Sequence, residues 1–271
     1  MIFSNIGRVL LYAIICYGIL LLAAMPFVPI ALNENANNLI LILVKESSFF
    51  VAGIIVILIS MKYYKDSLII YKPFFGLVYY FCTVILICVF CFGLYIFNII
   101  EISVFKITDF RLFVNFLIFC LIPTLFTGFG EELIFRWFLL NRLRAFLNLY
   151  TAVIIGSIIF CFGHNWNLPN ILFAFSGACL FSIVYIRTNS ILNCIGIHSA
   201  WNFGQRFLFQ GMSDFSYESQ RFLLLRINDL DKYNWAEFLY FAVLLLLVLV
   251  YLYFNQNTKS VMQILTPDLK N

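Results

Sequence analysis

Long uninterrupted runs of apolar residues constrain the fold of this chain more than any other feature. About eight of them are long enough, or nearly so, to cross a hydrocarbon core of roughly 30 Å as helices. Apolar residues make up 63% of the 271 residues and charged residues only 11%, whereas about a quarter of a soluble domain is charged. We therefore predict an all-α, polytopic integral membrane protein, a bundle of about eight transmembrane helices. The predicted helices cover residues 9–31, 48–63, 74–100, 112–140, 150–164, 168–186, 189–208 and 234–254.

The distribution of charge between the loops predicts an orientation. Loops on one side carry mostly basic residues, among them Arg142, Arg144 and Arg187, while a mixed-charge loop over 209–233 lies on the other side. Basic loops stay in the cytoplasm, so both termini are expected there, with the protein in the cell membrane. The first run lacks an obvious cleavage site and is expected to remain as a helix. The net charge of +4 then reflects topology, and no nucleic-acid partner is expected.

One stretch of the fourth run, TGFGEELIFRWFLL (residues 127–140), places two adjacent carboxylates and a guanidinium among apolar residues. On a soluble helix, Glu131 and Glu132 would be ordinary first-turn acids, and Glu132 would pair with Arg136 one turn later. In a membrane, each charge at a helix centre costs about 2.5 to 3.5 kcal/mol on insertion scales. Ionisable residues in such a place are therefore candidates for function and require partners.

The chain contains only two histidines, and both are candidate partners. His164 ends the fifth run, and His198 lies in the seventh. On a helix, Asn202 and Arg206 follow His198 by one and two turns and share its face. We expect Arg206 to snorkel to the outer interface, with an extension of the polar stripe into the site, or the binding of a substrate carboxylate, as alternatives.

Helix lengths permit these residues to meet. If the fourth and fifth runs form a hairpin that turns near Asn148, Glu131 and His164 each lie about 25 Å from the turn, at one level on antiparallel neighbours. His198 returns from a second turn, near Asn189, to a broadly similar level. Convergence of the charged stretch with both histidines is therefore geometrically allowed.

Three short motifs occur in the order typical of a known family of membrane proteases. Glu-Glu-Leu-Ile-Phe-Arg at 131–136 matches EExxxR, Phe-Cys-Phe-Gly-His at 160–164 matches FxxxH, and His-Ser-Ala-Trp-Asn at 198–202 matches HxxxN. Together they resemble the CAAX protease and bacteriocin-processing family of intramembrane proteases, of the prenyl-protein endopeptidase type. We expect one membrane domain over residues 1–271 with a motif-bearing core at 112–208.

The resemblance implies hydrolysis of a peptide bond in a membrane-associated or lipidated peptide by a glutamate-activated water. Glu131 is the expected general base. The resemblance assigns His164 and His198 to orienting the water and stabilising developing charge, and Asn202 to donating a hydrogen bond to the oxyanion. Membrane lipids are the other expected partners, and the oligomeric state stays open.

The resemblance also assigns Glu132 and Arg136 as a supporting ion pair, although geometry alone would allow the two glutamates to exchange roles. A small residue often follows the motif arginine in the family, whereas Trp137 stands here. Its bulky ring would narrow access or alter helix packing. Pro123 and the two glycines of the TGFG segment are the expected kink points of this helix.

A metal-dependent variant stays open beside the metal-free mechanism, which we favour with no cofactor. Glu131, His164 and His198 would form a zinc site with an open fourth position, and the other glutamate would be the base. The chain lacks the HExxH pattern. A CxxC at Cys88 and Cys91 lies inside an apolar run, where cysteine usually packs as a small apolar side chain.

Two functions without hydrolysis also fit the charged residues. Glu, His and Arg inside spans mark proton or ion relays in transporters, although no inverted repeat is visible. A membrane immunity protein of the same fold would instead sequester a peptide. Substitution of Glu131 by Gln separates these alternatives, because it abolishes turnover in a protease but leaves sequestration nearly intact.

Overall fold

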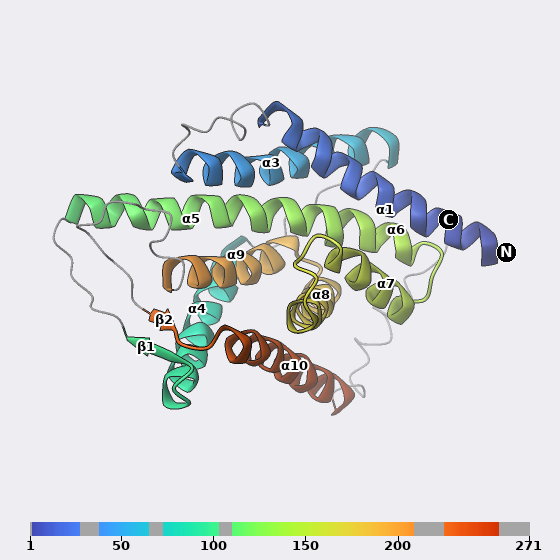
Figure 1. Ribbon diagram of the computed structural model, residues 1–271. Coiled ribbons are helices and arrows are strands. Elements are labelled where there is room, and N and C mark those ends of the chain that lie inside the picture. The colour runs from blue at the N-terminus through green and yellow to red at the C-terminus, as the bar shows by residue number, and fades with distance from the viewer. Residues whose placement is uncertain (1, 28–37, 65–72, 103–109, 209–224, 255–271) are drawn as a thin grey trace.

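The computed structural model describes residues 2–27, 38–64, 73–102, 110–208 and 225–254. Nearly all of them are helical, which confirms the predicted all-α membrane fold (Figure 1). Of the predicted polar loop 209–233, residues 209–224 lie outside the described part. The elements are α1 (Ile2–Ala24), η1 (Met25–Phe27), α3 (Asn38–Ile59), η2 (Ser60–Tyr64), α4 (Pro73–Ile96), β1 (Ile100–Ile102), α5 (Phe110–Glu132), η3 (Leu133–Leu140), α6 (Asn141–Arg144), α7 (Leu149–Cys161), α8 (Leu168–Thr188), α9 (Ile191–Leu208), β2 (Leu225–Ile227) and α10 (Leu230–Phe254).

Several helices are suited to a lipid environment. Within the described residues, five are long and apolar enough to cross a membrane, and α7 is apolar but shorter. These five are Asn5–Ala24, Leu43–Tyr64, Phe74–Ile96, Leu168–Thr188 and Leu230–Phe254. The helices α5 and α9 carry four of the predicted site residues, Glu131, Glu132, His198 and Asn202, and complete the bundle. The chain is therefore an integral membrane protein.

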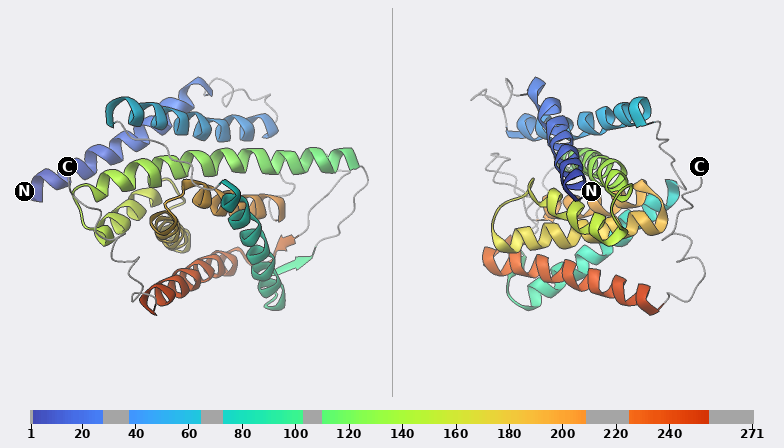
Figure 2. Two further views of the ribbon diagram at one scale, coloured as in Figure 1. Left: turned by 180° about the vertical axis from the view of Figure 1, so that it is seen from behind. Right: turned by 90° about the vertical axis from the view of Figure 1, so that its right-hand side faces the viewer.

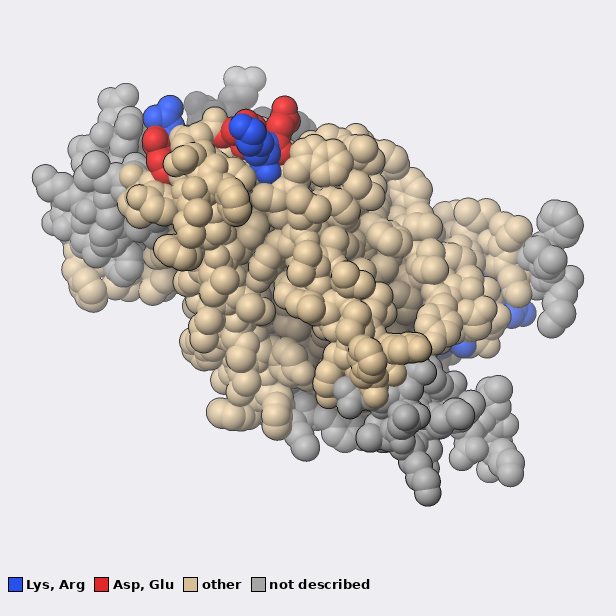
Figure 3. Space-filling view, turned by 90° about the horizontal axis from the view of Figure 1, so that it is seen from below, with Lys and Arg blue, Asp and Glu red and all other residues tan. Residues whose placement is uncertain are grey.

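The outer surface supports the same conclusion. Large apolar side chains such as Leu246, Leu247 and Phe254 of α10 are mostly exposed. Exposed apolar area of this extent marks contact with another apolar phase, here lipid. Figure 3 shows a face that is almost free of charge, with acidic and basic side chains at one edge and basic ones at the opposite edge.

The long helix α5 runs through the middle of the molecule, with α1 and α3 on one side and α4, α8, α9 and α10 on the other (Figures 1 and 2). It packs against α3 and α9. A Cβ atom at Gly130 would collide with the backbone of Phe49 in α3, and one at Gly128 would collide with Ser199 in α9. Glycine is required at Gly130 because two helix backbones approach so closely there, whereas at Gly128 the nearest atom is the side-chain oxygen of Ser199.

The predicted kink at these glycines is not what the structure shows. The helix α5 continues through Pro123 to Glu132 without interruption. The glycines of the TGFG segment act as contact points between helices instead.

The turns between the later helices lie where the sequence predicted them. Asn148 precedes α7 and its side chain accepts a hydrogen bond from the Thr151 N–H at 2.9 Å. Asn167 caps α8 in the same way through Asn170. Asn189 ends α8 in the left-handed conformation, with φ of 47°, which asparagine tolerates better than most residues. These caps fix where α7, α8 and α9 begin, and so fix the level of the residues that they carry.

A small antiparallel pairing joins β1 to β2 and was not predicted. Ile100 lies opposite Ile227, and Glu101 forms an ion pair with Arg226 at 3.4 Å. Strands of three residues are too short to show the alternation on which sequence prediction depends. The pairing ties the end of α4 to the segment that enters α10.

Candidate active site

The charged stretch lies where α5 passes into the π-helical segment η3. All eight residues of η3 are buried, and the segment contacts α1, α3, α7, α8 and α9. π-Helical turns inside helices are frequent at functional sites. The two glutamates thus end α5 at the centre of the molecule, and Arg136 follows in η3.

Glu132 is completely enclosed by the protein. Its side chain is 0% exposed, and its Oε2 lies 3.2 Å from Nε of Arg136. Its Oε1 lies 2.7 Å from Nδ1 of His198. An ionised carboxylate can only accept hydrogen bonds, so Nδ1 of His198 carries the hydrogen and donates it. Glu132 therefore fixes the orientation of His198.

Arg136 is equally buried and receives additional support from two aromatic rings. Its guanidinium carbon lies 4.4 Å from the ring centre of Phe160 and 5.3 Å from that of Phe181. A cation over a desolvated aromatic face gains roughly 2 kcal/mol. One carboxylate and two rings thus offset part of the cost of burying this charge, although the guanidinium nitrogens make no hydrogen bond to the described residues.

Glu131 differs from its neighbour because its carboxylate reaches a cavity. Its side chain is 12% exposed, and Oε2 lies 3.6 Å from Nε2 of His198. The cavity, which we call the glutamate pocket, has a volume of about 250 Å³. It is lined by Tyr17, Leu20, Ala24, Lys45, Ser48, Phe49, Glu131, Phe135, Phe160, Gly163 and His164.

His164 lies between the glutamate pocket and a second cavity of about 240 Å³, which we call the amide pocket. Its Nδ1 lies 3.2 Å from the carbonyl oxygen of Phe160. A carbonyl only accepts, so Nδ1 carries the hydrogen in this contact, and Nε2 presents a lone pair. The amide pocket is lined by Phe160, His164, Phe173, Ala174, Gly177, Ala178, Phe181, His198, Trp201, Asn202, Gln205 and Phe241.

All four residues predicted to be catalytic thus border the two cavities. Glu131 lines the glutamate pocket, His198 and Asn202 line the amide pocket, and His164 lines both. The predicted antiparallel geometry places Glu131 and His164 at one cavity, as expected. The three motifs converge in space as well as in order.

Comparison with known proteins agrees with this convergence. Residues 113–204 match the family model of the Type II CAAX prenyl endopeptidase Rce1-like proteins. The matched residues contain all three motifs. The resemblance and the predicted enzyme class, a peptide hydrolase, are confirmed, and the protein is an intramembrane protease. Comparison of the chain with curated proteins gives no significant match.

Arg206 does not follow the prediction. Instead of snorkelling to an interface, it forms an ion pair with Glu46 of α3, with 2.9 Å between Nη2 and Oε1. Thr127 of α5 also donates a hydrogen bond to Glu46. Both charged side chains are mostly buried. The pair therefore joins α3, α5 and α9, a contact between distant segments that no local pattern indicates.

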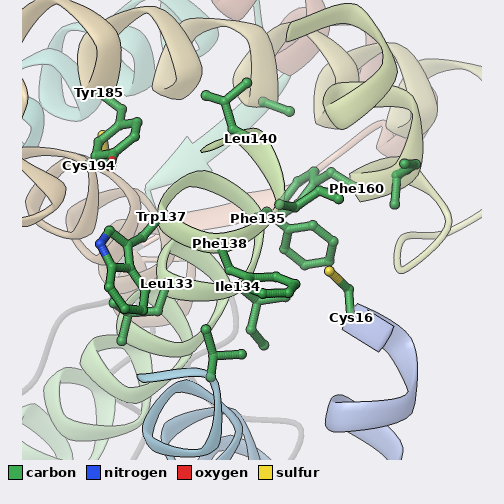
Figure 4. Close-up of a cluster of buried hydrophobic side chains, with 14 of the residues drawn as sticks. Cys16, Leu133, Ile134, Phe135, Trp137, Phe138, Leu140, Phe160, Tyr185 and Cys194 are labelled. Carbon is green, nitrogen blue, oxygen red and sulfur yellow. The ribbon is translucent and has the colours of Figure 1, made fainter. Parts of the chain in front are cut away.

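Trp137 does not narrow the endopeptidase site. Its ring is buried in the core on the side of η3 near Leu133 and Cys194, whereas Phe135 lies towards Phe160 (Figure 4). It lines neither the glutamate pocket nor the amide pocket. The predicted obstruction by its bulky ring is therefore wrong.

Gln205 is a polar residue of the amide pocket that the sequence reasoning missed. It follows His198 by seven residues and Asn202 by three, so it extends their helical face by one turn. Its side chain borders the same cavity. The i+7 spacing on the polar stripe would have identified it.

The predicted alternative metal ligands do not form a binding group in this structure. Among the described residues, no three His, Cys, Asp or Glu side chains lie close enough to hold a metal ion. Glu131 and Nε2 of His198 would supply two ligands, but His164 does not complete the set. Cys91 is buried and Cys88 exposed, and neither belongs to a disulfide. We therefore derive no step through a metal.

Proposed function

We propose that this protein hydrolyses a peptide bond of a membrane-associated or lipidated peptide, with Glu131 as the base that activates water. One observation carries the proposal. Of the two adjacent buried carboxylates, Glu131 reaches a cavity, whereas Glu132 is enclosed between Arg136 and His198. A base must be accessible to water and substrate, and a supporting charge need not be.

The separation between Glu131 and His198 suits a bridging water. At 3.6 Å, Oε2 and Nε2 are beyond direct hydrogen-bond distance, and a water that bonds to both would lie to one side of the line that joins them. With Nδ1 of His198 donating to Glu132, Nε2 is free to accept from that water. A water has two hydrogens, so one bonds to Glu131 and the other to Nε2 of either His198 or His164, which lies at the boundary of both pockets.

The reaction then follows a balanced sequence. Glu131 takes a proton from water, and the hydroxide oxygen bonds to the substrate carbonyl carbon. Charge develops on the carbonyl oxygen, and the side-chain amide of Asn202 donates a hydrogen bond to it. The C–N bond breaks as the protonated Glu131 returns its proton to the leaving nitrogen, which restores the carboxylate.

The walls of the two pockets favour an apolar peptide. Aromatic and small apolar side chains form most of both linings. We propose that the substrate reaches the site from the bilayer, and that both termini of the protease are cytoplasmic in the cell membrane. The edge with only basic side chains in Figure 3 supports this orientation.

Peptide-library cleavage by the purified, detergent-solubilised protein tests the mechanism. Wild type is compared with Glu131→Gln, each with and without a strong chelator. Thr83→Ala is the matched control, because the Thr83 hydroxyl donates a partly buried hydrogen bond to the carbonyl oxygen of Tyr79 and Thr83 lines neither pocket. We expect cleavage by wild type and the control, none by Glu131→Gln, and no effect of the chelator.

Other outcomes would point to different functions. Loss of cleavage with the chelator and rescue by zinc would reassign His164 and His198 as metal ligands. Peptide binding without cleavage by folded wild type would favour a sequestering immunity protein. Transport driven by a proton gradient, lost in Glu131→Gln, would indicate a relay.

A further inference from the structure

A buried carboxylate outside the proposed catalytic residues is hydrogen-bonded to Gln205, which lines the amide pocket. Glu237 of α10 is only 4% exposed. It accepts hydrogen bonds from the Tyr233 hydroxyl at 2.7 Å and from Nε2 of Gln205 at 2.5 Å. Among the described residues, it forms no ion pair with a basic side chain. An ionised carboxylate with only neutral donors around it is expensive to bury.

We propose that Gln205 is a substrate-binding residue, whose side-chain carbonyl accepts a hydrogen bond from a backbone N–H of the bound peptide, and that Glu237 positions it. The inference rests on the proposed peptidase function. It adds a contact that binds the peptide chain beside the bond to be cleaved.

The orientation of the Gln205 amide follows from chemistry. A carboxylate accepts hydrogen bonds, so the NH₂ end of Gln205 must face Glu237 and the carbonyl oxygen must point away from it. The same side chain lines the amide pocket together with Asn202 and His198. Glu237 thus prevents the amide from turning over and keeps a hydrogen-bond acceptor available to the pocket.

A peptide in this cavity needs such an acceptor. The remaining wall is mainly apolar, with Phe173, Ala174, Gly177 and Phe241 among its residues. A backbone N–H that is buried without a partner costs about 1 to 3 kcal/mol. In the proposed reaction, His164 and His198 bind the water and Asn202 binds the oxyanion. Gln205 is therefore the polar side chain of this pocket that is left to bind the backbone of the peptide.

The role of Glu237 is difficult to explain as stabilisation alone. An apolar side chain of similar volume at such a position is often neutral or stabilising in other proteins. Orienting a glutamine at the cavity wall is a role that would explain why a carboxylate is buried here. The same residues would not be needed merely to pack α10 against α8.

Kinetics with the best-cleaved library peptide test the inference. In Gln205→Leu and Glu237→Leu we expect KM to rise about three- to tenfold, the range of one hydrogen bond, with kcat changed much less. Glu237→Gln keeps a carbonyl that can accept from Gln205 and should recover most of this loss. Thr83→Ala controls for loss of a partly buried hydrogen bond elsewhere.

A series of N-methylated peptides identifies the partner atom. Methylation of the one backbone nitrogen that faces Gln205 should raise KM for wild type but add nothing in Gln205→Leu. The inference would be overturned if N-methylation at every peptide position raised KM by the same factor in wild type and in Gln205→Leu. An unchanged KM in Gln205→Leu would also overturn it. Should Glu237→Leu fail to fold, the glutamine variant and the peptide series still decide.

Binding measured in a Glu131→Gln background separates this inference from the proposed function. Thermal stabilisation by the same peptide should weaken when Gln205→Leu is added. Binding that depends on Gln205 without any cleavage by wild type would contradict the peptidase and retain the peptide contact. Cleavage by wild type, together with peptide binding that does not change in Gln205→Leu, would retain the peptidase and contradict the peptide contact.

Discussion

The two cavities that meet at His164 differ in the chemistry of their walls. The glutamate pocket, on the side of α1 and α3, is lined by the charged residues Glu131 and Lys45. The amide pocket, on the side of α8, α9 and α10, contains imidazole and amide groups from His198, Asn202 and Gln205. Phe160 and His164 belong to both.

This difference separates proton transfer from hydrogen bonding. Transfer of a proton requires a group that changes charge, and the accessible carboxylate is on one side of the boundary. Neutral groups with fixed directions are suited to stabilising an oxyanion and holding a peptide, and these lie on the other side. Substitutions in one pocket, or at the boundary between the two, should therefore have different effects.

The largest effect is expected in the glutamate pocket. Glu131→Gln should lower kcat by about 10² to 10⁴-fold, since general base catalysis is worth that much, while peptide binding persists. Single-turnover cleavage and binding measured on the same preparation provide the test. Glu132→Gln should instead reduce stability, and equal catalytic loss with unchanged stability in both variants would contradict the distinction between the two glutamates.

The boundary between the pockets depends on the buried charge of Arg136. Arg136→Met should destabilise the protein by about 3 to 5 kcal/mol, because it removes the basic partner of Glu132. Denaturant unfolding in detergent measures the change. The double variant Arg136→Met with Glu132→Gln should recover part of the loss, because no unpaired buried charge remains. No recovery would mean that the cation's contact with Phe160, rather than the ion pair, holds the boundary.

Within the amide pocket, Asn202 and Gln205 should separate kcat from KM. Asn202→Ala should lower kcat by about 10² to 10³-fold, the cost of removing one oxyanion donor, with little change in KM. Steady-state kinetics on one peptide measure both constants. A loss confined to KM would place Asn202 beside Gln205 as a binding residue.

The smallest effects should come from the glycines that set the helix spacing. Gly130→Ala pushes on the backbone of Phe49, a wall of the glutamate pocket, and should cost about 1 to 3 kcal/mol through overpacking. Gly128→Ala pushes on Ser199, next to His198, and should affect the amide pocket instead. Gly93→Ala is the matched control because a Cβ there meets nothing within 4 Å.

Thermal unfolding and cleavage assays distinguish these glycine variants. A stability loss in Gly93→Ala equal to that in Gly130→Ala would indicate a general effect of replacing helical glycine. If Gly128→Ala and Gly130→Ala change KM and kcat in different proportions, the two pockets respond independently to the spacing of the helices.

Local sequence patterns determined much of this protein. Apolar runs of membrane-spanning length specified the helices because lipid provides no hydrogen-bond partners for an exposed backbone. Asn148 and Asn189 marked turns through capping and left-handed backbone preferences. Helical rise then placed Glu131 and His164 at one level, since both are a fixed number of residues from the same turn.

Contacts between distant segments were decided by tertiary structure. Trp137 faces the core rather than the cavity because η3 directs it there, and Arg206 finds Glu46 160 residues away. The enclosure of Glu132 and the accessibility of Glu131 could not be read from two adjacent identical residues. Spacing along a helix gives the face of a residue, but its exposure and partners depend on which other helices cover that face.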